Sequence, residues 1–186
     1  IDITVNAAPS ITFAPVGAVC ENDNNIFISA SPNGGVYSGT GIVNQFTGEF
    51  DPGVAGSGSH TITYTVTTNG CTSSSTTTVT VSPAPVATIT PVAPVCGSAS
   101  PITLTPVQPG GTFSGPGVTG NTFDPAVAGP GIHTITYTIT VGGCTSVGTT
   151  SIAVSNPLVL TDFVLDVTCN GADNGVIGIG VSGGVG

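Results

Sequence analysis

Cysteines are the side chains in this 186-residue sequence best suited to covalent chemistry, and four of the five recur at matched positions of a repeat. Cys20 corresponds to Cys96, and Cys71 corresponds to Cys144. In an exported chain this pattern favours one disulfide in each copy, Cys20–Cys71 and Cys96–Cys144. Each bond would close a loop of about 50 residues and stabilise the fold by roughly 4 kcal/mol in the chain-entropy model. Cys169 has no counterpart, and we predict that it is unpaired within this segment.

Two other roles for the matched cysteines are disfavoured. Buried free thiols are the first alternative, but Cys71 and Cys144 stand directly after turn sequences, where a disulfide is the better interpretation. A zinc site is the second, but the sequence has no Cys-x-x-Cys pair and both histidines are far from any cysteine.

The histidines lie in the most strongly repeated stretch. Residues 50–65 read FDPGVAGSGSHTITYT, and residues 123–138 read FDPAVAGPGIHTITYT. A catalytic histidine would need a nucleophile and an orienting acid held alike in both copies, so we expect a structural imidazole bonded to a backbone carbonyl or to the nearby aspartate. An aspartate before proline can accept backbone N–H bonds in the following turn, while proline fixes φ. We predict no catalytic residue, and the predicted structural motif comprises Asp51, Pro52, His60, Tyr64, Asp124, Pro125, His133 and Tyr137.

Calcium is the metal that this sequence could best bind, because loop carboxylates and carbonyls are its usual ligands. Each copy of the repeat has only one acid at a repeated position. Glu21 and Asp23 could supply more ligands in the first copy, but their counterparts are Gly97 and Ala99. We therefore predict no cofactor, with calcium at Glu21 and Asp23 as the alternative.

The charge of the chain excludes several functions. The sequence has no Lys or Arg, nine acidic residues and a formal net charge of −9. Nucleic-acid binding is disfavoured, because phosphate backbones are bound by cationic side chains. The glycine motifs at 39–41 and 115–117 lack the lysine and the following helix of a phosphate loop. No apolar run reaches the roughly 18 residues of a membrane span, so we expect no membrane insertion, and residues 1–10 do not look like a signal peptide.

Short runs of Val, Ile, Thr and aromatic residues alternate with polar residues between 28 Gly and 15 Pro. This pattern predicts many short strands and almost no helix. About seven strands in each copy of about 75 residues predict an all-β fold of tandem immunoglobulin-like β-sandwich modules in an extended array. We assign residues 1–8 to the last strand of a preceding module, 9–83 and 84–156 to two Ig-like modules, and 157–186 to the beginning of a third module.

Several motif blocks resemble a known class of repeats. VCGSASPITLTP, GGTFSGPGV, FDPAVAGPGIHTITYT and GGCTS resemble the Ig-like and PKD-like repeats of large secreted surface proteins of the Bacteroidota. Residues 166–186, DVTCNGADNGVIGIGVSGGVG, resemble the opening of an SprB repeat, named for the gliding-motility adhesin. The resemblance implies type IX secretion, an extracellular cell-surface location and a role in cell adhesion and gliding motility.

These observations lead us to expect a non-catalytic stalk or surface filament segment of a secreted adhesin. Its expected partners are neighbouring modules of the same chain, identical subunits and surface polysaccharide. One alternative is a self-polymerising filament subunit, in which residues 1–8 of one chain complete the fold begun at 157–186 of another by strand addition. The other is a carbohydrate-binding module of a secreted protein, with exposed aromatic rings stacked on sugars.

Overall fold

The computed structural model describes residues 6–165 and 176–184. Within these ranges the chain is almost entirely β-structure with two helices of four residues each, which confirms the predicted all-β class. It folds as two compact units. The first comprises Ile1–Pro85 with Thr140–Ser146, and the second comprises Val86–Ile139 with Val147–Gly186.

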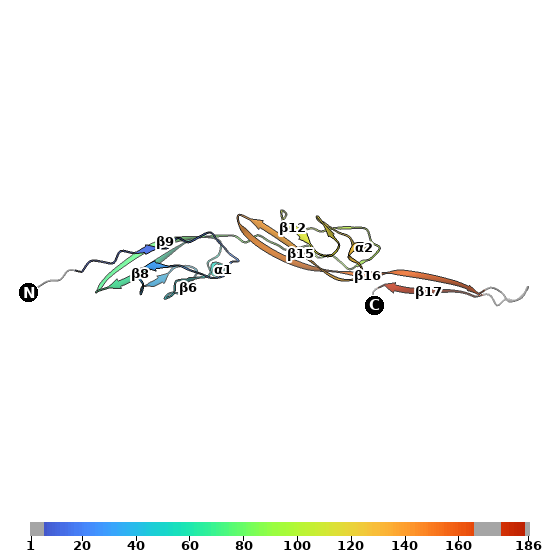
Figure 1. Ribbon diagram of the computed structural model, residues 1–186, viewed down its shortest axis with the longest axis horizontal. Helices are drawn as coiled ribbons and strands as arrows, with labels where there is room; N and C mark the ends of the chain where they lie inside the picture. The colour runs from blue at the N-terminus through green and yellow to red at the C-terminus, as the bar shows by residue number, and fades with distance from the viewer. Residues whose placement is uncertain (1–5, 166–175, 185–186) are drawn as a thin grey trace, which may run out of the picture. The chain divides into compact units, whose positions relative to one another are not determined.

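The first repeat forms a β-sandwich of immunoglobulin-like type, whose elements can be followed in Figure 1. One sheet has the strand order β2-β9-β8-β5, the other has the order β3-β7-β6, and β1 pairs with β4. The last hairpin, β8–β9, thus shares a sheet with β5, as the F–G hairpin shares a sheet with strand C in immunoglobulin domains. The elements are β1 (Thr12–Phe13), β2 (Val19–Cys20), β3 (Ile26–Phe27), β4 (Ala30–Ser31), β5 (Val36–Ser38), β6 (Ile42–Asn44), β7 (Glu49–Phe50), α1 (Pro52–Ala55), β8 (Gly58–Thr68) and β9 (Cys71–Ser82).

The second repeat has the same topology. Its sheets have the orders β10-β16-β15-β12 and β11-β14-β13, and a single bridge between Ile89 and Pro106 stands where β1 and β4 pair in the first repeat. The short strand β2 runs parallel to β9 in the first repeat, and β10 runs parallel to β16 in the second. The pairs β5–β8 and β12–β15 are antiparallel. The elements are β10 (Val95–Cys96), β11 (Ile102–Thr103), β12 (Thr112–Ser114), β13 (Val118–Thr119), β14 (Thr122–Phe123), α2 (Pro125–Ala128), β15 (Gly131–Val141), β16 (Cys144–Leu165) and β17 (Val176–Gly184).

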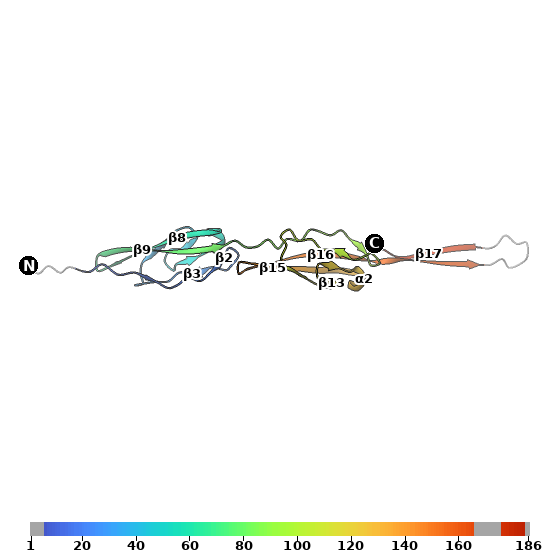
Figure 2. The ribbon, with the colours of Figure 1, turned by 90° about the horizontal axis from the view of Figure 1, so that it is seen from above.

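Each repeat contains a long hairpin, β8–β9 and β15–β16, whose strands are labelled in Figure 2. A turn of two residues joins the strands in each hairpin. Asn69 and Gly70 adopt φ of 51° and 80°, the left-handed conformation that a tight hairpin turn requires. Gly142 and Gly143 adopt φ of 59° and 88° in the second hairpin. The predicted turn residues therefore form the two hairpin tips.

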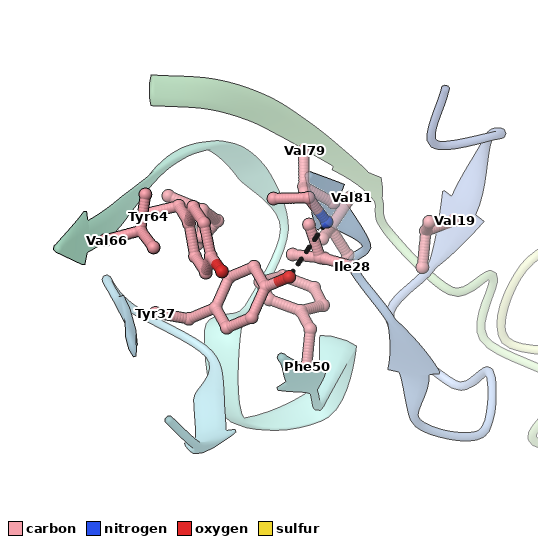
Figure 3. Close-up of a cluster of buried hydrophobic side chains, with 10 residues drawn as sticks. Val19, Ile28, Tyr37, Phe50, Tyr64, Val66, Val79 and Val81 are labelled. Carbon is pink, nitrogen blue, oxygen red and sulfur yellow. Dashed lines mark hydrogen bonds between the residues drawn. The ribbon is translucent and has the colours of Figure 1, made fainter. Parts of the chain in front are cut away.

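The core follows from strict alternation along these hairpins. In β8 the side chains of Ile62, Tyr64 and Val66 are buried, while the intervening threonines face outward. Ten buried residues form one cluster in the first unit, and eight of them are labelled in Figure 3. Burying a large apolar side chain contributes about 1.5–3 kcal/mol. This repeated alternation therefore accounts for most of the driving force that closes each sandwich.

The two short helices depart from the prediction of almost no helix. Each follows the repeated Asp-Pro pair, so that proline occupies the first turn, where its fixed φ suits a helix and its missing N–H costs nothing. Both helices have only four residues because a glycine with φ of 77° follows at once, Gly56 in α1 and Gly129 in α2.

The predicted module boundaries stay predictions. The border between the units, Pro85–Val86, lies two residues beyond our predicted boundary, but β16 runs without interruption from Cys144 to Leu165 across the predicted start of a third module. Its second half pairs with β17 in an antiparallel ribbon. The predicted strand at residues 1–8 lies largely outside the described residues, and residues 6–8 form no strand.

Neither of the two helices in the described part of the chain has the length and apolar character that crossing a membrane requires.

Candidate functional site

The structure contains one disulfide among the described residues, and it joins Cys20 to Cys144, with their Cα atoms 5.6 Å apart. Both residues belong to the first compact unit, because the tip of the β15–β16 hairpin is part of that unit. In the sequence, however, Cys20 belongs to the first repeat and Cys144 to the second, 124 residues later. The predicted pairs Cys20–Cys71 and Cys96–Cys144 are therefore wrong.

Strand register explains the correction. Cys20 lies in β2 opposite Ser82, the last residue of β9, whereas Cys71 is the first residue of β9. Ser82 lies eleven positions after Cys71 along the strand, which corresponds to about 36 Å at 3.3 Å per residue. A disulfide needs Cα atoms within about 7 Å of each other. Cys96 and Cys144 are separated in the same way by the register of β10 on β16.

Polar contacts hold the residues around the bridge. The side-chain amide of Asn22 donates to the backbone carbonyl of Thr145 at 2.9 Å and lies 3.4 Å from the hydroxyl of Ser146. The Asp23 carboxylate accepts the backbone N–H of Cys20 at 2.8 Å. The hairpin tip is thus attached to the β2 turn by hydrogen bonds as well as by the covalent bond.

Two described cysteines remain free. Cys71 is half-buried, and its thiol lies 3.4 Å from the backbone carbonyl of Asn6, to which it donates. Cys96 is exposed. Cys169, which we predicted to be unpaired within this segment, lies outside the described residues. No sequence signal separated the bonded cysteines from the free ones, because all four occupy matched repeat positions.

The repeated aspartates cap the two short helices. One oxygen of Asp51 accepts the backbone N–H groups of Gly53 at 2.9 Å and Val54 at 3.2 Å, directly after the ring of Pro52. Such caps satisfy helix N–H groups that have no partner within the helix. The second repeat has the same arrangement, with Asp124 before Pro125 accepting from Ala126 at 2.9 Å and Val127 at 3.4 Å.

The repeated histidines connect the end of each helix to the following strand. The Nε2 atom of His60 lies 2.8 Å from the carbonyl oxygen of Gly56, and that of His133 lies 2.8 Å from the carbonyl oxygen of Gly129. Because a carbonyl oxygen only accepts, Nε2 carries the proton in both rings. The imidazoles therefore fix the corner between helix and strand.

Two tyrosines of the repeated motif hold a turn from the inside of the core. The Tyr64 hydroxyl donates to the carbonyl of Pro32 at 2.7 Å and accepts the N–H of Gly35 at 2.8 Å. Only 1% of the surface of Tyr64 is exposed, so its hydroxyl depends on these two partners within the protein. In the second repeat Tyr137 bonds Gln108 and Gly111 in the same way, each at 2.7 Å.

The calcium hypothesis gains no supporting geometry. Within the described ranges, no three or more His, Cys, Asp or Glu side chains gather in a group that could hold a metal ion. Asp23 uses one carboxylate oxygen to accept the N–H of Cys20. Calcium at Glu21 and Asp23 stays a hypothesis.

Sequence reasoning missed two exposed aromatic residues. Phe27 is 68% exposed and Phe46 is 72% exposed, and both border a surface depression of about 260 Å³ in the first repeat. The available signal was strand alternation, because Phe27 follows Ile26 and precedes the buried Ile28. The counterpart of Phe27 in the second repeat is Thr103, so this pair is specific to the first repeat.

No protein-family model matches the sequence. Comparison with curated proteins likewise finds no match.

Proposed function

We propose that this chain is a structural segment, a stalk or filament, of a large secreted cell-surface adhesin and that it is not an enzyme. The resemblance to Ig-like, PKD-like and SprB-type repeats supports this assignment and extends it to type IX secretion and gliding motility. Its proposed partners are further modules of this kind and surface polysaccharide. The Cys20–Cys144 bond suits an oxidising environment outside the cell.

The observation that carries the proposal is the covalent link between cysteines of two sequence repeats. A stalk must carry tension along its chain without lengthening. When a chain is pulled at its two ends, force passes through the Cys20–Cys144 bond and bypasses the chain between the bonded positions, which are 124 residues apart in the sequence. Those residues cannot be drawn out while the bond is intact, even if the sandwich around them loosens.

Single-molecule pulling tests the proposal. The chain is held at residues 1 and 186 and stretched with and without a thiol reductant. The fully extended chain is expected to be about 40–45 nm longer after reduction, since 124 residues add roughly 3.3–3.6 Å each. A Cys20→Ser variant serves as the control and should give the longer value under both conditions. Equal extended lengths for the oxidised and reduced parent chain would remove the basis of the stalk assignment.

A second candidate function, carbohydrate binding, rests on Phe27 and Phe46. Exposed aromatic rings beside a shallow depression offer apolar faces that sugar rings can cover, and both residues border the same depression. The backbone turn at Asn33–Gly35 forms another side of it and presents polar groups for sugar hydroxyls. This surface would give the first repeat a ligand while the second repeat remained a spacer.

Glycan-array binding tests this candidate. A polysaccharide ligand should bind the parent chain and lose most of its affinity in Phe46→Ala and Phe27→Ala variants. Val54→Ala is the matched control, because Val54 is 63% exposed but does not line the depression. Binding that survives both phenylalanine substitutions, or no binding to any glycan, would contradict a carbohydrate site here.

A further inference from the structure

Each repeat has two cysteine positions, one in a short strand and one at the tip of the long hairpin, and the observed disulfide joins one cysteine from each kind of position. We call Cys20 and Cys96 the β2-type cysteines, and Cys71 and Cys144 the tip cysteines of the two hairpins. The observed bond joins the β2-type cysteine of the first repeat to the tip cysteine of the second. One cysteine of each kind, Cys96 and Cys71, is left free among the described residues.

The backbone around Cys96 reproduces that around the bonded Cys20. Cys20 lies opposite Ser82 in a parallel pair, and Cys96 lies opposite Ser155 in an equivalent pair. The residue after each cysteine donates its N–H to the facing serine carbonyl at 2.9 Å in both repeats. The carbonyl of each cysteine also accepts the N–H of the residue three positions later, at 3.0 Å in both. Cys96 is thus presented as Cys20 is, but it is exposed and has no partner among the described residues.

The surroundings of Cys71 point to the complementary partner. Its thiol lies 3.4 Å from the carbonyl of Asn6, and the side chain of Asn6 donates to the carbonyl of Asn69 at 3.1 Å. Asn6 precedes Ser82 by 76 residues, the same interval that separates Cys20 from Cys96. Cys20 faces Ser82, so Asn6 stands at the position that a β2-type cysteine would face one repeat earlier.

We propose that Cys96 and Cys71 are the two halves of a repeating disulfide, so that Cys96 of one chain bonds the tip cysteine Cys71 of a second copy of the same chain. Each copy then bonds one neighbour through Cys96 and another neighbour through Cys71, so that successive bonds join the copies head to tail. This inference rests on the repeat and on the observed bond, and it holds whether or not the chain serves as an adhesin stalk.

The bond forms by thiol–disulfide exchange with a small-molecule disulfide such as oxidised glutathione. The Cys71 and Cys96 thiols each give up a proton, and the new S–S bond leaves two electrons with the oxidant. The S–S bond of the small-molecule disulfide breaks, and its two halves leave as thiols that carry the two protons. In the observed bond, the side chain of Asn22 donates to the carbonyl of Thr145 beside the tip cysteine. Ser98 corresponds to Asn22 and Thr72 corresponds to Thr145, so we expect the Ser98 hydroxyl of one copy to contact the Thr72 carbonyl of the other.

The test uses two variants that each keep the Cys20–Cys144 bond and one free cysteine, both in a Cys169→Ser background. Cys71→Ser retains the β2-type Cys96, and Cys96→Ser retains the tip Cys71. Each variant alone and an equal mixture of both are equilibrated in a glutathione redox buffer, alkylated, and separated on a non-reducing gel. Mass spectrometry after thermolysin digestion identifies the bonded cysteines, since the chain has no Lys or Arg for trypsin.

The parent chain, with both cysteines, is expected to form a ladder of dimers, trimers and longer species. The mixture should stop at dimers, and its heterodimer should exceed the half of all dimers that random pairing gives. A matched control adds Cys71→Ser and Ser73→Cys to the Cys96→Ser variant, which moves the tip thiol two residues along the same strand, and should abolish this excess.

Four results would overturn the proposal. The first is a heterodimer fraction at or below random pairing. The second is an excess that persists with the displaced thiol, which would mean that strand register does not direct the bond. The third is a Cys71–Cys96 bond within one parent chain. Peptide mapping of the same material must also recover Cys20–Cys144, and its absence would likewise overturn the proposal.

Discussion

Individual side chains in this protein are matched to the hydrogen-bonding capacity of the backbone that they face. Tyr37 in the first repeat corresponds to Phe113 in the second. The Tyr37 hydroxyl accepts the buried N–H of Ala30 at 2.9 Å. The counterpart of Ala30 is Pro106, which has no N–H to donate. A hydroxyl is therefore present in the repeat that has a donor to satisfy and absent in the repeat that has none.

We predict that Tyr37→Phe lowers the free energy of unfolding by about 1–3 kcal/mol, because the N–H of Ala30 loses its partner in the core. Adding Ala30→Pro removes that N–H, so the double variant should lose less than the sum of the two single losses. Urea denaturation followed by circular dichroism measures all three. Strict additivity of the two losses would argue against this matching.

Tyr37 also makes stability depend on alkaline pH. Burial raises the pKa of Tyr37 above its usual value of 10.0, the bond from Ala30 partly offsets this, and nearby Tyr64 adds to the rise. Since the folded pKa exceeds the unfolded one, this contribution is complete below pH 10 and is lost as the pH rises through the folded value. Urea unfolding between about pH 8 and pH 11 should therefore show a steeper loss for the parent chain than for Tyr37→Phe. Equal slopes would contradict this origin.

The Asp51 cap gives a further residue-scale prediction. Asp51→Ala should lower the free energy of unfolding by about 0.5–2 kcal/mol, since two N–H groups of α1 lose their acceptor. Asp51→Ser, which retains a capping oxygen, should recover most of the loss. Thermal unfolding of both variants measures the effect, and no difference between them would show that capping is not the source.

At the scale of the elements, hairpin and turn fit together only because glycine occupies the point of closest approach. A Cβ atom at Gly35 would contact the backbone oxygen of Thr65 and lie 2.6 Å from the ring of Tyr64. The same approach recurs at Gly111 against Thr138 and Tyr137. The turn that each buried tyrosine holds is therefore packed directly against the hairpin.

We predict that Gly35→Ala costs roughly 1–3 kcal/mol or more, because the backbone of β8 must move to admit the methyl group. Gly17→Ala is the matched control, since no atom lies within 4 Å of a Cβ there and its backbone is not left-handed. Differential scanning calorimetry should show a lower melting temperature only for the first variant. Equal melting temperatures would contradict the packing argument.

At the scale of the whole molecule, the disulfide between Cys20 and Cys144 closes a long loop of the chain. The chain-entropy model gives about 5 kcal/mol for a loop of this length, since 124 residues separate Cys20 from Cys144. We predict that Cys20→Ser with Cys144→Ser lowers the free energy of unfolding by several kcal/mol. Cys71→Ser with Cys96→Ser is the control and should change it little in the monomer. A comparable loss in the control would place the stabilising bond elsewhere.

Much of this architecture could be predicted from local patterns. Alternation in the stretch around His60 and His133 fixes which side chains enter the core, and Asn69-Gly70 can only be a tight turn. The Asp-Pro pairs indicate a turn capped by the aspartate, but they do not indicate that this turn forms a short helix. Strand alternation could have indicated that Phe27 is exposed, whereas the exposure of Phe46 depends on which neighbours cover it.

The sequence by itself determined that the chain is all-β, that it is built from two copies of one sandwich, and which side chains fill each core. These properties follow from periods of two residues and from turn chemistry, which act over short distances along the chain. Only the tertiary structure decided which cysteines meet. Four equivalent positions allow several pairings. The register of β2 against the far end of β9 sets Cys71 apart from Cys20, and the tip of the β15–β16 hairpin, which belongs to the same compact unit, places Cys144 beside it.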